Sequence, residues 1–420
     1  EWNFTALERF KPFFDKQLTL EEKIIPTPKS FLWVGDVRYY DAASPQSRLP
    51  IIVLPENPAP AERMAAKILQ KKIGQVLAGV ISAKNNNGVK ARVMEKDFYF
   101  NDIFDAKLIL SIGRNTVYQK VQPDLPLQSI RDKQQGYIIK AEPVGNSHVV
   151  FLLGETPVGS FNAAATAVQL FENDECIYHN ATVIDYPDFL GRSYVFKNWE
   201  NKKELQNDLD AVERMSLYKL NKVYFGYKRK KKNWHQIDPI YRAGLKAAGR
   251  LFREGGVMSL AQMVNPYSHF AMEPSAEELS DQLRYTWTHS SPQSFKMLQD
   301  VYRIGLEAGA DTIMLLSDDF VPHTGKNRQN YELFTLEDEN HFVNLQNAQA
   351  HLINKLKQWI DRDFPDTRFE FCPPLYSNEH IDRSEGKAEL YFKELTFQIP
   401  QDVAVIWTGP TIRSLSIDMA

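Results

Sequence analysis

The sequence has little of what several protein classes require. Only two of its 420 residues are cysteines, Cys176 and Cys372, and they lie far apart, so neither a disulfide framework nor a thiolate metal site is indicated. No apolar run approaches the roughly 18 residues of a membrane helix, and we expect no membrane span. The 50 basic and 53 acidic residues leave a formal charge of -3, which offers no global attraction to nucleic acid or to a membrane surface.

Familiar catalytic motifs are missing as well. The chain has no GxSxG elbow, no P-loop and no GxGxxG after a strand, which excludes the common serine hydrolases, nucleotidases and dinucleotide enzymes. Its histidines form no HExxH or comparable pair, so we expect neither a metal nor another cofactor. Because the chain begins with Glu1 rather than Met, we expect that an upstream segment has been removed. A cleaved secretory signal would make the protein secreted or periplasmic.

The hydrophobic pattern divides the chain into three parts. Hydrophobic residues make up 43% of the sequence, enough for more than one core. Residues 1–45, rich in aromatic residues and proline, are interpreted as an N-terminal arm. Residues 46–184 combine short apolar strands, two amphipathic helices and a hairpin, which predicts a small α/β domain. A proline-containing turn at residues 185–188 then opens a third part, residues 185–420.

Strands and helices alternate regularly in this third part. The expected strands are residues 193–196, 222–225, 257–264, 312–316, 368–371 and 403–407. Six strand-then-helix units favour a parallel sheet covered by helices, and at this length a (β/α)8 TIM barrel. A closed barrel needs two more units, so we expect a barrel that is incomplete at its C-terminus and a chain short of its native length. An open α/β sheet, which tolerates six strands, is the alternative.

In a barrel, the chemistry lies just beyond the carboxyl ends of the strands. The continuous apolar strand at residues 312–316 is followed by Ser317, Asp318 and Asp319. Two neighbouring carboxylates push one pKa upward, so that the pair can supply a proton donor and a proton acceptor at one pH. Such a pair more often forms a turn or a helix N-cap, but a place at a barrel mouth favours catalysis.

The other strands end in further candidates. Lys228 follows the second strand and could reach a ligand hydroxyl or carboxylate, whereas the basic run at residues 229–232 is typical of a solvated loop. Tyr376 follows the fifth strand, and Trp407 and Thr408 follow the sixth. Either aromatic ring could equally be part of the core.

Five segments in order carry a family resemblance. They are DYPDF at 185–189, KLNKVYFGYK at 219–228, LLSDDF at 315–320, CPPLY at 372–376 and IWTG at 406–409. The barrel region resembles glycoside hydrolase family 84, the β-N-acetylglucosaminidases that include O-GlcNAc hydrolases and bacterial enzymes labelled hyaluronidases. The preceding α/β domain is similar to the small domain before the barrel in this family and in family 20 hexosaminidases.

The resemblance implies substrate-assisted hydrolysis with retention, through an oxazoline intermediate, of N-acetylhexosaminide linkages in a glycan. Asp319 would protonate the leaving oxygen and later deprotonate the attacking water. Asp318 would hold the N–H of the sugar's 2-acetamido group, whose carbonyl oxygen attacks C1. Lys228 would contact sugar hydroxyls, Tyr376 would hydrogen-bond near the acetamido group, and Thr408 would line the pocket.

Departures from the family pattern keep two alternatives open. Residues 192–199 place side chains where the family has glycines close to the sugar, and the family's seventh-strand segment is absent from this chain. These differences motivate a non-catalytic glycan-binding protein on a degenerate barrel. A glycosidase of another specificity, with Asp318 and Asp319 as acid and base, is a further possibility. If residues 229–232 face the mouth, they favour an anionic, sulfated or uronic-acid glycan.

Overall fold

The computed structural model describes residues 18–41, 48–80, 91–95, 103–173, 175–196, 201–227, 237–266, 288–318, 336–382, 384 and 386–411. The chain divides into two compact units. The first runs to Arg192 and also takes in Glu213–Asn221 and Glu254–Val257, and the second contains the remaining residues. The chain therefore passes between units at Arg192 and returns twice to the first, whereas the sequence predicts one change, between residues 184 and 185.

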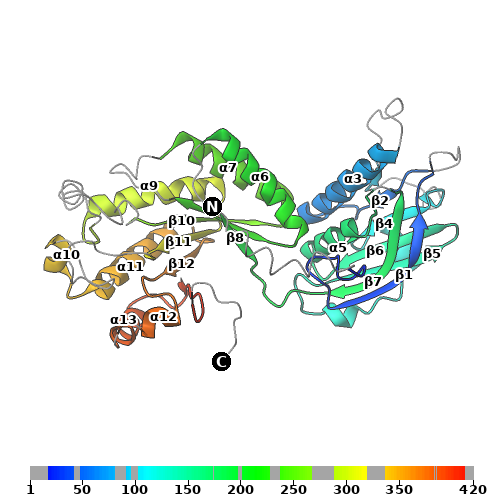
Figure 1. Ribbon diagram of the computed structural model, residues 1–420. Coiled ribbons are helices and arrows are strands. Elements are labelled where there is room, and N and C mark those ends of the chain that lie inside the picture. Colours follow the sequence, from blue (N-terminus) through cyan, green and yellow to red (C-terminus); the bar gives the residue numbers. More distant parts are fainter. Residues whose placement is uncertain are drawn as a thin grey trace, which may run out of the picture. The chain divides into compact units, whose positions relative to one another are not determined.

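A mixed seven-stranded sheet with the order β1-β7-β5-β6-β4-β2-β3 forms the first unit (Figure 1). Its strands are β1 (Ser30–Arg38), β2 (Ile51–Val53), β3 (Arg92–Met94), β4 (Leu108–Ile112), β5 (Tyr137–Val144), β6 (Ser147–Gly154) and β7 (Ile177–Asp185). The predicted hairpin is confirmed as the antiparallel pair of β5 and β6. β1 lies within the residues predicted as an arm and is the edge strand, paired with β7.

Two long helices build the core of this unit. They are α3 (Pro60–Val80) and α5 (Pro157–Gln169), and the shorter α4 (Thr116–Val121) and the 3-10 helix η3 (Leu127–Ile130) complete it. The alanine-rich face of α5 is fully buried in the same apolar cluster as α3. Small residues let the helix lie close to the sheet: a Cβ on Gly154 would come within 2.1 Å of the Ser160 nitrogen.

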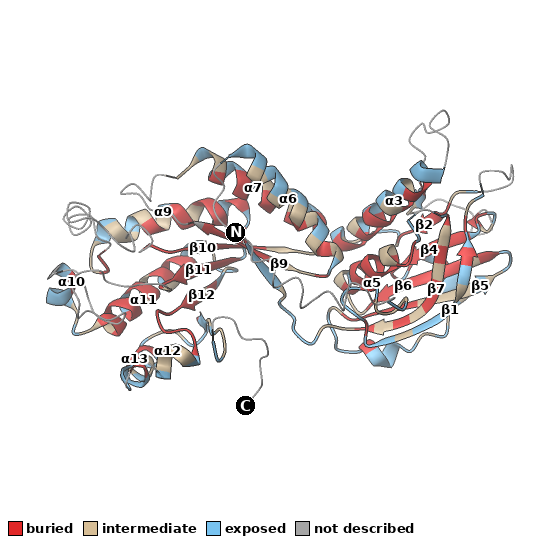
Figure 2. Ribbon diagram, viewed as in Figure 1, coloured by how far each residue is buried: buried red, intermediate tan, exposed pale blue. Residues whose placement is uncertain are grey.

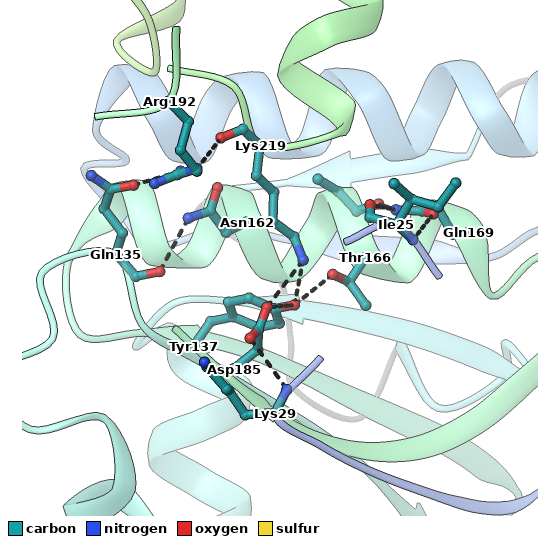
Figure 3. A network of polar contacts seen from close by, with 11 residues as sticks. Ile25, Lys29, Gln135, Tyr137, Asn162, Thr166, Gln169, Asp185, Arg192 and Lys219 are labelled. Atoms are coloured by element: carbon teal, nitrogen blue, oxygen red, sulfur yellow. Dashed lines mark hydrogen bonds and ion pairs between the residues drawn. The ribbon is translucent and has the colours of Figure 1, made fainter. Parts of the chain in front are cut away.

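A buried polar network holds the turn between α6 (Lys202–Leu217) and β9 (Lys222–Tyr227) in the first unit (Figure 3). The Lys219 Nζ lies 3.2 Å from Asp185 Oδ2 and donates to the Tyr137 hydroxyl at 2.7 Å. The Tyr137 hydroxyl lies 2.9 Å from the same Asp185 oxygen and 2.7 Å from Thr166 Oγ1. Burial lowers the pKa of Lys219, and Asp185 opposes that effect.

The backbone of Lys219 is unusual for a lysine. Its φ is +62°, the left-handed conformation that glycine commonly supplies just after a helix. A glycine would adopt this backbone more easily but would leave Asp185 without its cation. The ion pair with Asp185 therefore explains why a lysine, rather than a glycine, occupies this position.

Among the described residues of the second unit, six parallel strands form one sheet. They are β8 (Ser193–Phe196), β9, β10 (Ser259–Val264), β11 (Thr312–Leu316), β12 (Arg368–Cys372) and β13 (Ala404–Val405). Their order in the sheet, β13-β12-β11-β10-β9-β8, is the order of the chain. A doubly wound open sheet reverses its order at a switch point, whereas successive barrel strands always pair with the next in sequence. The topology therefore favours the barrel interpretation over the open sheet.

Helices separate these strands. They are α6, α7 (Pro239–Gly255), α9 (Pro292–Ala308), α10 (Leu336–His341), α11 (Leu345–Asp363), α12 (Asn378–Asp382) and α13 (Lys387–Thr396). Local signals explain their ends: the Ser291 side chain caps α9, and Gly309, with φ +98°, ends it. Between β11 and β12 the described residues form two helices, α10 and α11, and the Asn344 side chain caps the start of α11 by accepting from Asn347 N.

None of the described helices combines the length and the apolar character needed to cross a bilayer.

Candidate active site

The strands β10 and β11 are buried along almost all of their length (Figure 2), but the side chains on the two faces of the six-stranded sheet differ in exposure. On one face the side chains are at most 1% exposed: Val223, Phe225, Leu260, Val264, Ile313, Leu315 and Phe371. Helices cover this face, as the hydrogen bond from Gln262 Nε2 to Val301 O in α9 illustrates. On the other face, a cluster packs around the fully buried Ala261, and its other members keep 6 to 8% exposure: Tyr224, Met263, Met314, Leu316, Cys372 and Tyr376. We call this second surface the inner face, since in a barrel it lines the interior.

Two polar side chains follow the inner-face residues of β10 and β11. Side chains alternate along a strand, so Asn265 continues the row of Ala261 and Met263, and Asp318 continues the row of Met314 and Leu316. Asn265 is buried, whereas Asp318 is half-buried. The Asn265 Nδ2 donates to both Asp318 O and Asp318 Oδ1, each at 3.1 Å. The carboxyl ends of two neighbouring strands are thus joined by an amide-to-carboxylate contact.

A second polar contact joins the segments that follow β12 and β13. Thr408 donates to the carbonyl oxygen of Tyr376 from its backbone N–H, at 2.8 Å, and from its hydroxyl, at 2.9 Å. The His380 ring meets the Tyr376 ring edge-on at 4.6 Å between centroids. Thr408 therefore acts on the placement of Tyr376, and the CPPLY and IWTG segments form one structural element.

A charged group lies deeper on the same face. Glu370 accepts from Lys222 Nζ at 2.8 Å and from the Tyr224 hydroxyl at 2.6 Å. Burial, together with Glu370, raises the pKa of Tyr224, so its hydroxyl remains a donor. Glu370 pairs in register with Met314, four residues before Asp318 and about 13 Å down the strand at the usual rise. This group therefore lies in a lower layer of the sheet, away from the carboxyl ends of the strands where barrel chemistry takes place.

The predicted site residues can now be placed. Asp318, Tyr376 and Thr408 all follow the carboxyl ends of their strands; Tyr376 and Thr408 touch each other, and Tyr376 shares an apolar cluster with Leu316 of β11. Lys228 and Asp319 lie outside the described residues, and their roles stay predictions. The prediction did not include Asn265, although its position directly after a buried strand is the same signal that identified Asp318.

Hydrogen bonds also join residues 289 and 290, which follow β10 in the chain, to α10, which follows β11. Asp338 of α10 accepts from His289 N, at 2.9 Å, and lies 2.9 Å from His289 Nδ1. Its other oxygen accepts from Ser290 N at 2.9 Å. Burial alone would raise the pKa of Asp338, but the hydrogen bonds and charge of His289 and the backbone donors lower it to about 2.

Asp338→Asn is expected to destabilise the protein by about 2 kcal/mol at neutral pH, because a lowered carboxylate pKa is a stabilising contribution. That contribution is complete above the ordinary value of 3.8 and is lost as the pH falls toward 2. Urea unfolding at several pH values measures it: the difference from wild type should shrink below about pH 4. Exposed Glu337→Gln is the matched control, and equal stability of Asp338→Asn and wild type at pH 7 would contradict the prediction.

Comparison with known proteins adds the family. The family model for NAGidase, beta-N-acetylglucosaminidase, matches residues 207–420, just over half of the chain. The chain belongs to the beta-N-acetylglucosaminidase family. The matched region includes the strands that carry Asn265, Asp318, Tyr376 and Thr408. A search of curated proteins finds no match.

Solved structures show the same fold as this beta-N-acetylglucosaminidase family member at low identity. CpGH84D aligns with a TM-score of 0.54 at 15% identity, over 92% of this chain and 55% of its own. CpGH84B gives 0.52 at 16%, over 92% and 56%. The beta-N-acetylhexosaminidase from Bacteroides fragilis NCTC 9343 gives 0.53 at 10%, over 91% and 70%. The chain spans about half the length of CpGH84D and CpGH84B.

Proposed function

We propose that this chain is a β-N-acetylhexosaminidase-type glycoside hydrolase that cleaves β-N-acetylglucosaminide linkages in a glycan, with retention. The observation that carries the proposal is the carboxylate of Asp318, which follows the inner face of β11 and is held through one oxygen by Asn265. The family match over residues 207–420 supports it. An anionic character of the glycan and a location outside the cytoplasm are further parts of the proposal.

The proposed first step uses the substrate's own amide. Asp318 accepts a hydrogen bond from the 2-acetamido N–H and orients the group, so that its carbonyl oxygen attacks C1 and forms a C1–O bond. The bond from C1 to the glycosidic oxygen breaks, and Asp319 gives that oxygen its proton. The products of this step are the free aglycone alcohol and a protonated oxazoline (an oxazolinium ion), whose N–H stays hydrogen-bonded to the Asp318 carboxylate.

The second step reverses these roles. Asp319, now a carboxylate, takes a proton from water as the water oxygen attacks C1. The C1–O bond of the oxazoline breaks, and the acetamido carbonyl is restored. Two inversions at C1 give overall retention without a covalent enzyme nucleophile. Lys228 and Tyr376 bind the sugar in this scheme, and Thr408 holds Tyr376 in place.

The test is the dependence of the rate on the acyl group of an aryl 2-amido-β-glucoside. Fluorine withdraws electrons from the amide oxygen and makes it a weaker nucleophile. The N-trifluoroacetyl substrate should therefore react at roughly one tenth of the rate of the N-acetyl substrate or less, which corresponds to an activation barrier higher by about 1.4 kcal/mol. An aryl β-glucoside without the amide should not be cleaved. Equal rates for the two amides would reject substrate assistance and favour a glycosidase that uses the Asp pair as acid and base.

A second candidate is a glycan-binding protein without turnover. Where the family has glycines near the sugar, residues 192–199 of this chain contain none. Calorimetric binding of N-acetylglucosamine oligosaccharides, combined with no product in a fluorogenic assay, would favour this candidate.

A further inference from the structure

The contact between Asn265 and Asp318 has only one chemically sensible orientation. The Asn265 Nδ2 lies 3.1 Å from two oxygens of Asp318, the backbone carbonyl and Oδ1. A flipped amide would bring its own oxygen against both acceptors, which is repulsive. Asn265 therefore presents N–H groups to Asp318. Since Asn265 is only 5% exposed, water replaces this donor poorly.

An N–H donor favours the charged form of the carboxyl group that it contacts. It also fixes the direction of that group, because the second bond of Asn265 anchors the donor to the Asp318 backbone. Both effects act on the residue that the proposed mechanism requires as a hydrogen-bond acceptor. A protonated or rotated Asp318 would not hold the acetamido N–H.

We infer that Asn265 is a positioning residue for catalysis: it binds Asp318 Oδ1, fixes the direction of the carboxylate, and keeps Asp318 ionised as the acceptor for the acetamido N–H of the substrate. The inference rests on the proposed function for the role of Asp318. The effect on the ionisation of Asp318 can be measured without it.

Other titratable groups of the inner face lie on β9 and β12. Lys222 and Tyr224 both donate hydrogen bonds to Glu370, about 13 Å below Asp318. These two donors stabilise the charge of Glu370 locally. Cys372 is the last residue of β12, and Tyr376 lies four residues further along the chain. The His380 ring contacts the Tyr376 ring. Asp319 is the next residue in the chain and lies outside the described residues. As a second carboxyl group adjacent in sequence, it can couple its titration to that of Asp318.

The experiment therefore measures the Asp318 pKa in an Asp319→Asn background, which removes this coupling. Aspartate is labelled with ¹³C at the carboxyl carbon, and the Asp318 signal is assigned by its loss in Asp318→Asn. Asn265→Ala removes the donor and should raise the pKa of Asp318 by about one unit. Asn265→Asp keeps the shape but adds a second carboxylate, and should raise it further. Asn173→Asp is the control, because this exposed residue already accepts from Lys72 through its oxygen.

Kinetics with Asp319 intact give the second readout. The acid limb of kcat/KM for an aryl N-acetyl-β-glucosaminide should move to higher pH in the order Asn265→Ala, then Asn265→Asp, while KM changes little. A residue that only stabilises the fold would lower activity at all pH values alike. If Asn265→Ala fails to fold, the isosteric Asn265→Asp carries the test.

The outcomes separate the two proposals. If the Asp318 pKa in both Asn265 variants stays within 0.3 unit of its value in the Asp319→Asn protein, the inference is overturned, whatever the activity. A shift of 0.3 unit corresponds to about 0.4 kcal/mol, too little for a contact that controls the ionisation of Asp318. A raised pKa in a protein with no turnover keeps the ionisation role of Asn265 and rejects the proposed function. If the protein turns over substrate but the acid limb of kcat/KM does not move in the Asn265 variants, the proposed function stands and the role of Asn265 is rejected.

Discussion

Asp319→Ala is expected to lower turnover of a glycoside with a poor leaving group by on the order of 10² to 10⁴, because a general acid no longer protonates the departing oxygen. An aryl glycoside whose phenolate leaves without a proton should lose far less in its first step. Comparison of kcat/KM for a chitooligosaccharide and for a nitrophenyl N-acetyl-β-glucosaminide measures this difference.

Asp318→Asn should show a different pattern. It removes the charge that orients and stabilises the acetamido group, so both substrates should lose rate by a similar factor, on the order of 10² or more. Asp311→Asn is the matched control, since Asp311 lies just before the opposite end of the same strand. Unchanged turnover of both substrates in Asp318→Asn would contradict the assigned role.

Lys219→Met is expected to destabilise the first unit by about 3 to 5 kcal/mol, because it leaves the buried carboxylate of Asp185 without its cation. The Lys219 and Asp185 side chains are only 4% and 10% exposed. Urea unfolding followed by circular dichroism at pH 7 measures the loss. Tyr137→Phe, which removes one donor and leaves the ion pair, should cost about 1 to 3 kcal/mol.

An exposed ion pair in the same unit provides the control. Lys71 and Glu213 also connect α3 with the returning segment, at 2.9 Å, but their side chains are 55% and 39% exposed. Glu213→Gln should change stability by less than about 1 kcal/mol. A double variant, Asp185→Leu with Lys219→Met, should recover part of the loss. If Lys219→Met and Glu213→Gln cost the same, burial does not set the strength of the network.

The order of the site segments could be predicted because their signals are local. The run at 312–316 is apolar on both faces, and it forms a strand that is buried throughout. Asp318 follows directly, so its place at the carboxyl end needs only the position of that strand. The separation of α10 from α11 could not be predicted in this way, since the cap at Asn344 resembles any other asparagine in the sequence.

By itself the sequence determined the alternation of strands and helices, the family resemblance, and which residues follow each strand. Only the tertiary structure decided their partners: Asn265 reaches Asp318 across 53 residues of chain, and Lys219 reaches Asp185 across 34. Periodicity predicts which side chains are buried, because residues that share one face of a strand or helix recur at a fixed interval along the chain. The partner of a polar group depends on strand pairing and register, which bring together segments that carry no mutual signal in sequence.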